Sequence, residues 1–127
     1  MPIRWTKYGI PENVAVRVAC GLVRGLCEGE VCGAVSGAIL VIEATHGNEE
    51  GSGVGTGEEE KAYCYEQTQK FIKCFKEVNQ STIYRELIKC DVSTEEGVTY
   101  ARKHDIFHTT CVELIKSAVT ILEELGY

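Results

Sequence analysis

Small residues gather in the segment from Cys27 to Gly37, and they constrain the fold of this chain more than any other feature of its sequence. Gly33 and Gly37 are four positions apart, so on a helix they share a face against which another backbone can pack closely. Cys32 precedes them, where the positive end of the helix dipole would favour the thiolate that attacks disulfides and binds metals. Cys32 is therefore the first functional candidate, and packing as a small buried hydrophobic side chain is the alternative.

The pattern of apolar residues predicts helices and no strand. Apolar residues recur at helical spacing in several segments, whereas no segment alternates with period two for long enough to form a strand. We therefore predict an all-α fold, a compact bundle of about five helices in which the first two pack closely through their glycines. Gly21 and Gly25 would line the first helix as Gly33 and Gly37 line the second. The predicted helical segments are 12–26, 31–45, 58–78, 83–89, 95–103 and 110–125.

The length and charge of the chain limit its domain organisation and its partners. Its 127 residues fit a single domain, in which residues 48–57 form a glycine-rich loop without the Gly-Lys-Ser/Thr that completes a phosphate-binding loop. A net charge of −6 would repel phosphate backbones, so nucleic acid is not an expected partner. The longest apolar run, 38–42, is too short to span a membrane, and the polar segment 1–7 does not resemble a signal peptide.

Cysteine usage indicates redox or metal chemistry in a reducing, cytoplasmic setting. The count is odd, and a domain of this length can form a core without disulfides. No two cysteines are separated by two residues, so any metal site must be assembled from distant segments. The seven cysteines are Cys20, Cys27, Cys32, Cys64, Cys74, Cys90 and Cys111.

Helical geometry separates these cysteines into groups. Cys64 and Cys74 lie on one predicted helix roughly 80° apart in direction, so they cannot both face one small site, and core packing is the simpler interpretation. Cys90 and Cys111 fall at helix boundaries, where a rigid element can expose a sulfur. His108 lies three residues before Cys111 and could supply a nitrogen ligand, although a solvated loop histidine is the simpler interpretation.

Three segments of the chain resemble a known family. They are Gly-Glu-Val-Cys-Gly-Ala-Val-Ser-Gly-Ala (29–38), Arg-Glu-Leu-Ile-Lys-Cys-Asp-Val-Ser-Thr-Glu-Glu-Gly (85–97) and Cys-Val-Glu-Leu-Ile-Lys-Ser-Ala-Val-Thr-Ile-Leu-Glu-Glu-Leu (111–125). Together they resemble the redox-active family that is named C_GCAxxG_C_C after its motif. The resemblance implies a small helical protein with several shared cysteines. A similar domain accompanies an iron-sulfur centre in split-Soret cytochromes, so the resemblance favours a cluster.

Residues carried over from this resemblance name the expected redox site. The cysteine of the Cys-Gly-Ala motif is Cys32 and that of the C-terminal helix is Cys111, and these two would carry the redox chemistry. The chain departs from the family in lacking a further N-terminal helix with its own cysteine. It also has Tyr84 where a cysteine commonly precedes Arg-Glu-Leu. Cys90, a few residues downstream, is also found at this place in members of the family.

An iron-sulfur cluster that transfers single electrons is the leading hypothesis from the sequence. On one straight helix, Cys20 and Cys27 would be about 10 Å apart along the axis, too far for one metal ion, so at most one of them joins the site unless the helix ends early. Cys27 is favoured because it flanks a turn next to Cys32. Gly33 and Gly37 would border the cofactor. The predicted ligands are Cys27, Cys32, Cys90 and Cys111.

Two alternatives to the cluster remain open. The first is a metal-free thiol-disulfide redox protein that pairs Cys32 with Cys90 or Cys111, and the second is a structural zinc site in a binding module. The cluster hypothesis and the thiol-disulfide hypothesis both favour an electron-transfer or thiol-redox role over a hydrolase or transferase activity. A redox partner protein is expected, and a homodimer is expected because the missing N-terminal helix would leave apolar surface uncovered.

Overall fold

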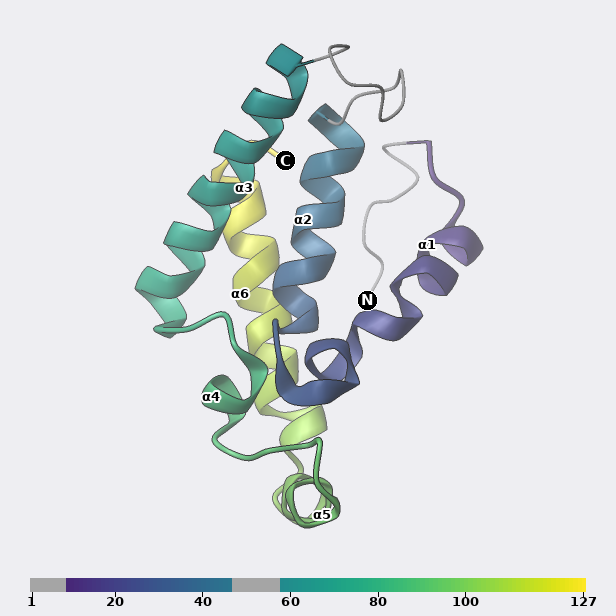
Figure 1. Cartoon of the computed structure of the whole chain (residues 1–127), viewed down its shortest axis with the longest axis vertical. Helices are drawn as coiled ribbons and strands as arrows, with labels where there is room; N and C mark the ends of the chain where they lie inside the picture. The colour runs from purple at the N-terminus through teal and green to yellow at the C-terminus, as the bar shows by residue number, and fades with distance from the viewer. Residues whose placement is uncertain (1–8, 47–57) are drawn as a thin grey trace.

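Three long helices form the body of the fold: α2 (Gly33–His46), α3 (Glu58–Asn79) and α6 (Thr110–Glu124) (Figure 1). The computed structural model describes residues 9–46 and 58–127, and within them each of these helices packs against the other two. An isolated bridge between Val31 and Ile83 is the only strand-like pairing in the described part of the chain. The predicted all-α fold is confirmed.

The core lies where the three long helices meet. Phe71 and Phe75 of α3 are four residues apart, are fully buried and stack with their ring centroids 6.0 Å apart. Ile42 of α2 and Ile121 of α6 pack in the same cluster. Because burial of one such side chain contributes about 1.5–3 kcal/mol, this cluster holds the bundle together without a disulfide.

Short elements close one end of the bundle. α4 (Tyr84–Ile88) and α5 (Glu95–Lys103) are followed by a 3₁₀ turn (Ile106–His108) that leads into α6. The Thr94 hydroxyl accepts a hydrogen bond of 3.0 Å from the Gly97 N–H, which caps the N-terminus of α5. These elements bring α4 and the first turn of α6 to the same end of the molecule (Figure 1).

The first helix is shorter than predicted, and the segment 12–26 is not one helix. α1 (Glu12–Ala19) leads into a 3₁₀ turn (Cys20–Leu22), and Val23 is extended. The backbone from Arg24 to Cys27 then lies in the left-handed region, with φ between 55° and 64°. Within α1 only Ala15 is buried, so little packing energy supports a longer helix across two glycines.

The predicted glycine contact between the first two helices is confirmed at one residue only. A Cβ on Gly33 would lie 2.9 Å from the carbonyl oxygen of Leu22, so the start of α2 packs tightly on the 3₁₀ turn. In the part of the chain that the structure describes, Gly21 and Gly37 have no neighbouring atom within 4 Å of the same position. The prediction of a continuous glycine seam is therefore wrong, because the first helix ends before its glycines can face α2.

Two further sequence predictions concern the glycine-rich loop and the membrane. The glycine-rich loop at residues 48–57 lies outside the described residues. Within the described ranges, no helix has both the length and the apolar character that crossing a membrane requires.

Candidate functional site

Backbone pairing brings the start of α2 next to the start of α4. The Cys32 N–H donates a 2.8 Å hydrogen bond to the Thr82 carbonyl, and the Tyr84 N–H donates a 2.6 Å bond to the Glu30 carbonyl. Segments separated by about fifty residues in sequence are thus held side by side. This pairing places Cys32, which directly precedes α2, in the neighbourhood of the Tyr84 side chain.

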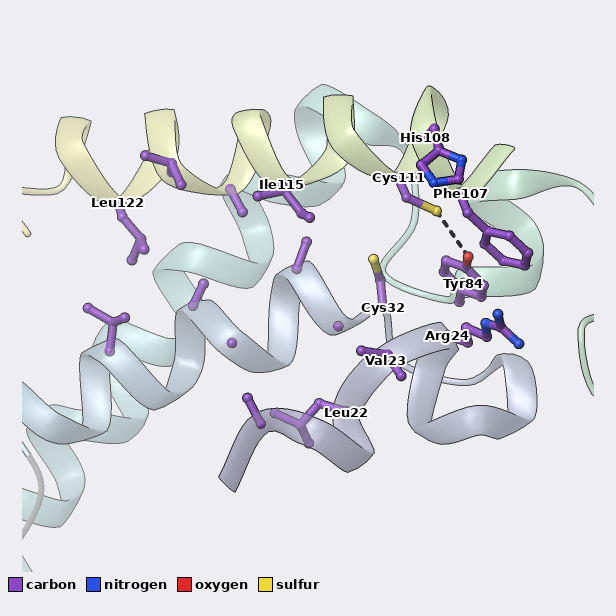
Figure 2. A pocket seen from close by; sticks show the side chains of 18 of the residues that line it. Leu22, Val23, Arg24, Cys32, Tyr84, Phe107, His108, Cys111, Ile115 and Leu122 are labelled. Carbon is purple, nitrogen blue, oxygen red and sulfur yellow. Dashed lines mark hydrogen bonds between the residues drawn. The ribbon is translucent and has the colours of Figure 1, made fainter. Parts of the chain in front are cut away.

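Cys111 lies in the first turn of α6 and faces the same region. Its sulfur and the Tyr84 hydroxyl oxygen share a hydrogen bond of 3.0 Å (Figure 2). When Cys111 is ionised, the hydroxyl donates to the thiolate, because a thiolate only accepts. Tyr84 is therefore a direct partner of Cys111.

Both sulfurs open onto one cavity of about 680 Å³. α2 and α6 form its long walls, and residues from Ala19 to Arg24 form a third side (Figure 2). Gly33 and Gly37, the predicted border of a cofactor, line this cavity as well. Its volume is typical of sites for small molecules.

Burial sets the acidity of the thiols. Cys32 is 4% exposed, and burial raises its pKa. The N–H groups of Ala34 and Val35 lower that pKa, as expected at a helix N-terminus, but their effect is smaller than that of burial. The predicted influence of the helix N-terminus on the pKa of Cys32 is therefore present, but burial outweighs it and the net pKa is raised.

The charge of Cys111 affects the pKa values of two other thiols, Cys32 and Cys90. Burial raises its pKa, while the hydrogen bond from Tyr84 and the charge of Arg24 lower it. Burial and then the charge of Cys111 raise the pKa of Cys90, and the same charge contributes to the raised pKa of Cys32. Among these cysteines, Cys111 is thus close enough to interact electrostatically with both of the others.

Comparison with known proteins places the chain in one family. The family model described as "Putative redox-active protein (C_GCAxxG_C_C)" matches residues 5–125, which is nearly the whole chain. The chain belongs to this family. No curated protein and no solved structure gives a significant match. The relation of the C_GCAxxG_C_C family to split-Soret cytochromes stays a prediction.

The predicted metal ligands of this C_GCAxxG_C_C protein are not all brought together. Cys90 is half-buried after the end of α4 and does not line the cavity, and Cys27 is exposed on the left-handed turn. Among residues 9–46 and 58–127, no three His, Cys, Asp or Glu side chains are grouped so that they could hold one metal ion. The arrangement described here therefore does not fit a cluster held by Cys27, Cys32, Cys90 and Cys111.

The other candidate residues of the sequence have structural or solvated positions. Cys64 is buried in the core and Cys74 packs against it, as the interpretation of core packing predicts. His108 is exposed at the edge of the cavity, with its Nδ1 atom 2.8 Å from the Asp105 carboxylate. Cys20, the alternative ligand, is exposed.

Arg24 is the functional candidate that the sequence did not reveal. Its guanidinium carbon lies 4.3 Å from the centre of the Phe107 ring, and its charge lowers the pKa of Cys111. The sequence predicts that Arg24 is part of a helix, but its backbone has left-handed geometry. No local sequence signal indicates this conformation. Only the folded arrangement places its charge at the cavity.

Raised thiol pKa values make the stability of the fold depend on pH. Burial raises the pKa values of Cys32, Cys64, Cys90, Cys111 and Tyr84 in the folded state. Their stabilising effect is complete below the unfolded-state pKa of a thiol, about 8.5, and is lost as the pH rises through the folded-state values. Urea unfolding under reducing conditions should give a constant free energy from about pH 6.5 to 8 and a falling one above about pH 9.

A variant with one buried thiol fewer separates this effect from general alkaline unfolding. Cys64→Ala removes a core thiol and should show a smaller decline in unfolding free energy between about pH 8 and 10 than the parent protein. An equal decline in both proteins would contradict the assignment.

Proposed function

We propose that this C_GCAxxG_C_C protein is a thiol-disulfide redox protein in which Cys111 attacks a partner's disulfide and Cys32 resolves the product. The main support is the position of Cys111, which shares a hydrogen bond with Tyr84 and opens onto the same cavity as Cys32. The family assignment supports a redox role in general.

The proposed reaction transfers two electrons to the partner. The Cys111 thiolate attacks one sulfur of the partner's disulfide, that bond breaks, and the leaving sulfur takes up a proton. The Cys32 thiolate then attacks the Cys111 sulfur of the mixed disulfide, and the second partner sulfur leaves and is protonated. The products are a Cys32–Cys111 disulfide and a partner dithiol.

Exposure and electrostatics support this division of roles. Cys111 is half-buried and carries two influences that lower its pKa, the hydrogen bond from Tyr84 and the charge of Arg24. Cys32 is 4% exposed and lies deeper in the wall of the cavity. A partner arriving from solvent would therefore reach Cys111 first, and Cys32 would react only with a sulfur already bound there.

The burial of Cys32 and Cys111 also supports a low reduction potential for their disulfide. Strongly oxidising dithiols owe their potential to a stabilised thiolate in the reduced state. Burial opposes ionisation of Cys32 and Cys111, so this source of oxidising strength is absent from the pair. We expect a low reduction potential and attack that becomes faster as the pH rises towards the pKa of Cys111.

Tyr84→Phe is expected to slow alkylation of Cys111 without unfolding the protein. Loss of the hydroxyl removes a hydrogen bond to the thiolate, so the pKa of Cys111 should rise further. Because a more basic thiolate is also more nucleophilic, the net rate with iodoacetamide at pH 8 should fall by only about threefold. Rate–pH profiles of both proteins, read by mass spectrometry, measure the shift.

Tyr100→Phe provides the matched control, because Tyr100 is exposed on α5 and does not line the cavity. Its Cys111 profile should overlay that of the parent protein. An unshifted profile in Tyr84→Phe would show that the hydroxyl does not act on the thiol.

An iron-sulfur cluster is the second candidate, and we infer it only from the family resemblance and from the coupling of Cys111 to both Cys32 and Cys90. Thiolates are the ligands that such clusters use. A structural zinc site is the third candidate. Since the described side chains do not group as metal ligands, no step of the proposed reaction involves a metal.

Absorption spectroscopy and metal analysis of anaerobically purified protein distinguish these candidates. The thiol-disulfide proposal predicts a colourless protein without stoichiometric metal and with titratable thiols. Brown colour with iron and sulfide would replace it with electron transfer by a cluster, and a colourless protein with stoichiometric zinc would replace it with the zinc module.

The remaining expectations on partners accompany this proposal. A protein disulfide is the proposed substrate, which makes a redox partner protein necessary. The exposed valines of α1, Val14, Val16 and Val18, support the predicted homodimer because they leave an apolar surface uncovered. A cytoplasmic location stays a prediction.

A further inference from the structure

The cavity has two chemically different ends, and the redox proposal uses only the end at Cys111. Ile115 and Leu122 of α6 lie along its apolar part, and Arg24 lies at the other end beside Tyr84 and Cys111 (Figure 2). We propose that this cavity binds a single-chain carboxylate, with the alkyl chain between α2 and α6 and the carboxylate at Arg24.

Small side chains on α2 create the space for an alkyl chain. Gly37 and Ala38 face the cavity from α2, and Ala118 faces it from α6. Among residues 9–46 and 58–127, no atom outside the backbone of α2 itself lies within 4 Å of the position that a Cβ on Gly37 would take, so the wall is open there. A volume of about 680 Å³ lies within the range of small-molecule sites, and such sites combine apolar walls with a few polar groups.

The positive charge of arginine side chains at the cavity favours a ligand with an anionic head group. Arg24 and Arg102 both line the cavity, and neither forms an ion pair with a carboxylate in the part of the chain that the structure describes. The protein as a whole carries a net charge of −6, so two guanidinium groups beside this apolar cavity give it a local charge opposite in sign to that of the whole protein. Guanidinium groups bind carboxylates through paired, charge-assisted hydrogen bonds.

The position of Arg24 is fixed before a ligand arrives. Its guanidinium rests on the Phe107 ring, with the guanidinium carbon 4.3 Å from the ring centre. A cation over an aromatic face keeps its N–H edges free to donate to an anion. The Tyr84 hydroxyl lies in the same part of the cavity (Figure 2), so a carboxylate at Arg24 would also lie near Cys111.

Dodecanoate is the probe that tests this proposal, with dodecan-1-ol as its uncharged analogue. Titration calorimetry on the full chain in the reduced state should show one dodecanoate per protein, bound at least about tenfold more tightly than the alcohol. Equal affinities, or no dodecanoate binding, would overturn the proposal.

Arg24→Gln tests the head-group contact, and Arg17→Gln on α1 is its control, because both remove one positive charge and only Arg24 lines the cavity. Arg24→Gln should weaken dodecanoate binding by about tenfold and leave alcohol binding unchanged, whereas Arg17→Gln should change neither. Equal effects of the two substitutions would overturn the assignment of the head group.

Gly37→Leu tests the position of the alkyl chain. The new side chain would fill the cavity from α2 without meeting a neighbouring atom at its Cβ, so the melting temperature should not fall. Dodecanoate binding should weaken by more than about tenfold. Undiminished binding to the folded variant would overturn the proposed site. Because these measurements use reduced protein and no disulfide, their outcome is independent of the redox proposal.

Discussion

Replacing Cys111 with serine is expected to stop the reduction of oxidised glutathione, a loss of at least about 100-fold in rate. Cys111 supplies the attacking sulfur in the proposed reaction, and a hydroxyl cannot take its place as a nucleophile towards a disulfide at neutral pH. The reaction should be followed by mass spectrometry in a background that carries Cys20→Ser and Cys27→Ser, since both of those thiols are exposed and would react independently.

The behaviour of Cys32→Ser separates the two roles. In this variant Cys111 can still attack, so a mixed disulfide with glutathione should accumulate on Cys111 instead of resolving. Cys74→Ser is the control, because Cys74 packs against the core and takes no part in the reaction. A Cys111→Ser variant that reduces glutathione at the parent rate would contradict the assignment of the nucleophile.

Replacing Gly25 with alanine is expected to lower the free energy of unfolding by about 2–4 kcal/mol. Gly25 has φ of +64°, and a Cβ there would lie 2.6 Å from both N and O of Glu30. It would also lie 2.8 Å from Cβ of Tyr84. Backbone atoms cannot move aside cheaply, so the turn would separate from α4 and disturb the hydrogen bond between Tyr84 and Cys111.

Urea unfolding measures the stability loss in Gly25→Ala, and iodoacetamide reactivity of Cys111 in the absence of urea reports the disturbance of the site. Gly21→Ala is the matched control, because Gly21 lies on the neighbouring 3₁₀ turn with no atom within 4 Å of its Cβ position and without positive φ. It should change the unfolding free energy by less than about 0.5 kcal/mol. Equal losses in both variants would mean that the close contact at Gly25 is unimportant.

The sequence predicted the helices that bury one face and failed where tertiary contacts decide the backbone. α2 and α6 have apolar residues at helical spacing, and both were expected close to their observed ends. The segment 20–29 was expected to be largely helical, but the approach of Gly25 to Glu30 and Tyr84 requires left-handed backbone there. Contacts with residues almost sixty positions away cannot be read from a local pattern.

The candidate site was predicted in part for the same reason. Motif resemblance identified Cys32 and Cys111, and the structure places both at one cavity. The sequence shows the helix end, which favours the thiolate of Cys32, but not the extent of burial, which has the larger effect on the pKa. Neither the hydrogen bond between Tyr84 and Cys111 nor the place of Arg24 at the cavity was expected, since these contacts depend on how α4, α6 and the left-handed turn meet.

Disulfide mapping during a redox titration tests the central claim most directly. The full chain would be equilibrated with graded ratios of reduced and oxidised dithiothreitol, trapped with acid and alkylated, and then cleaved. Cleavage after Glu28 or Glu30 separates Cys27 from Cys32. We predict that a Cys32–Cys111 disulfide forms as a two-electron couple before any other crosslink. A disulfide between Cys90 and Cys111 in its place, or reduced Cys32 and Cys111 throughout while other thiols oxidise, would contradict the claim.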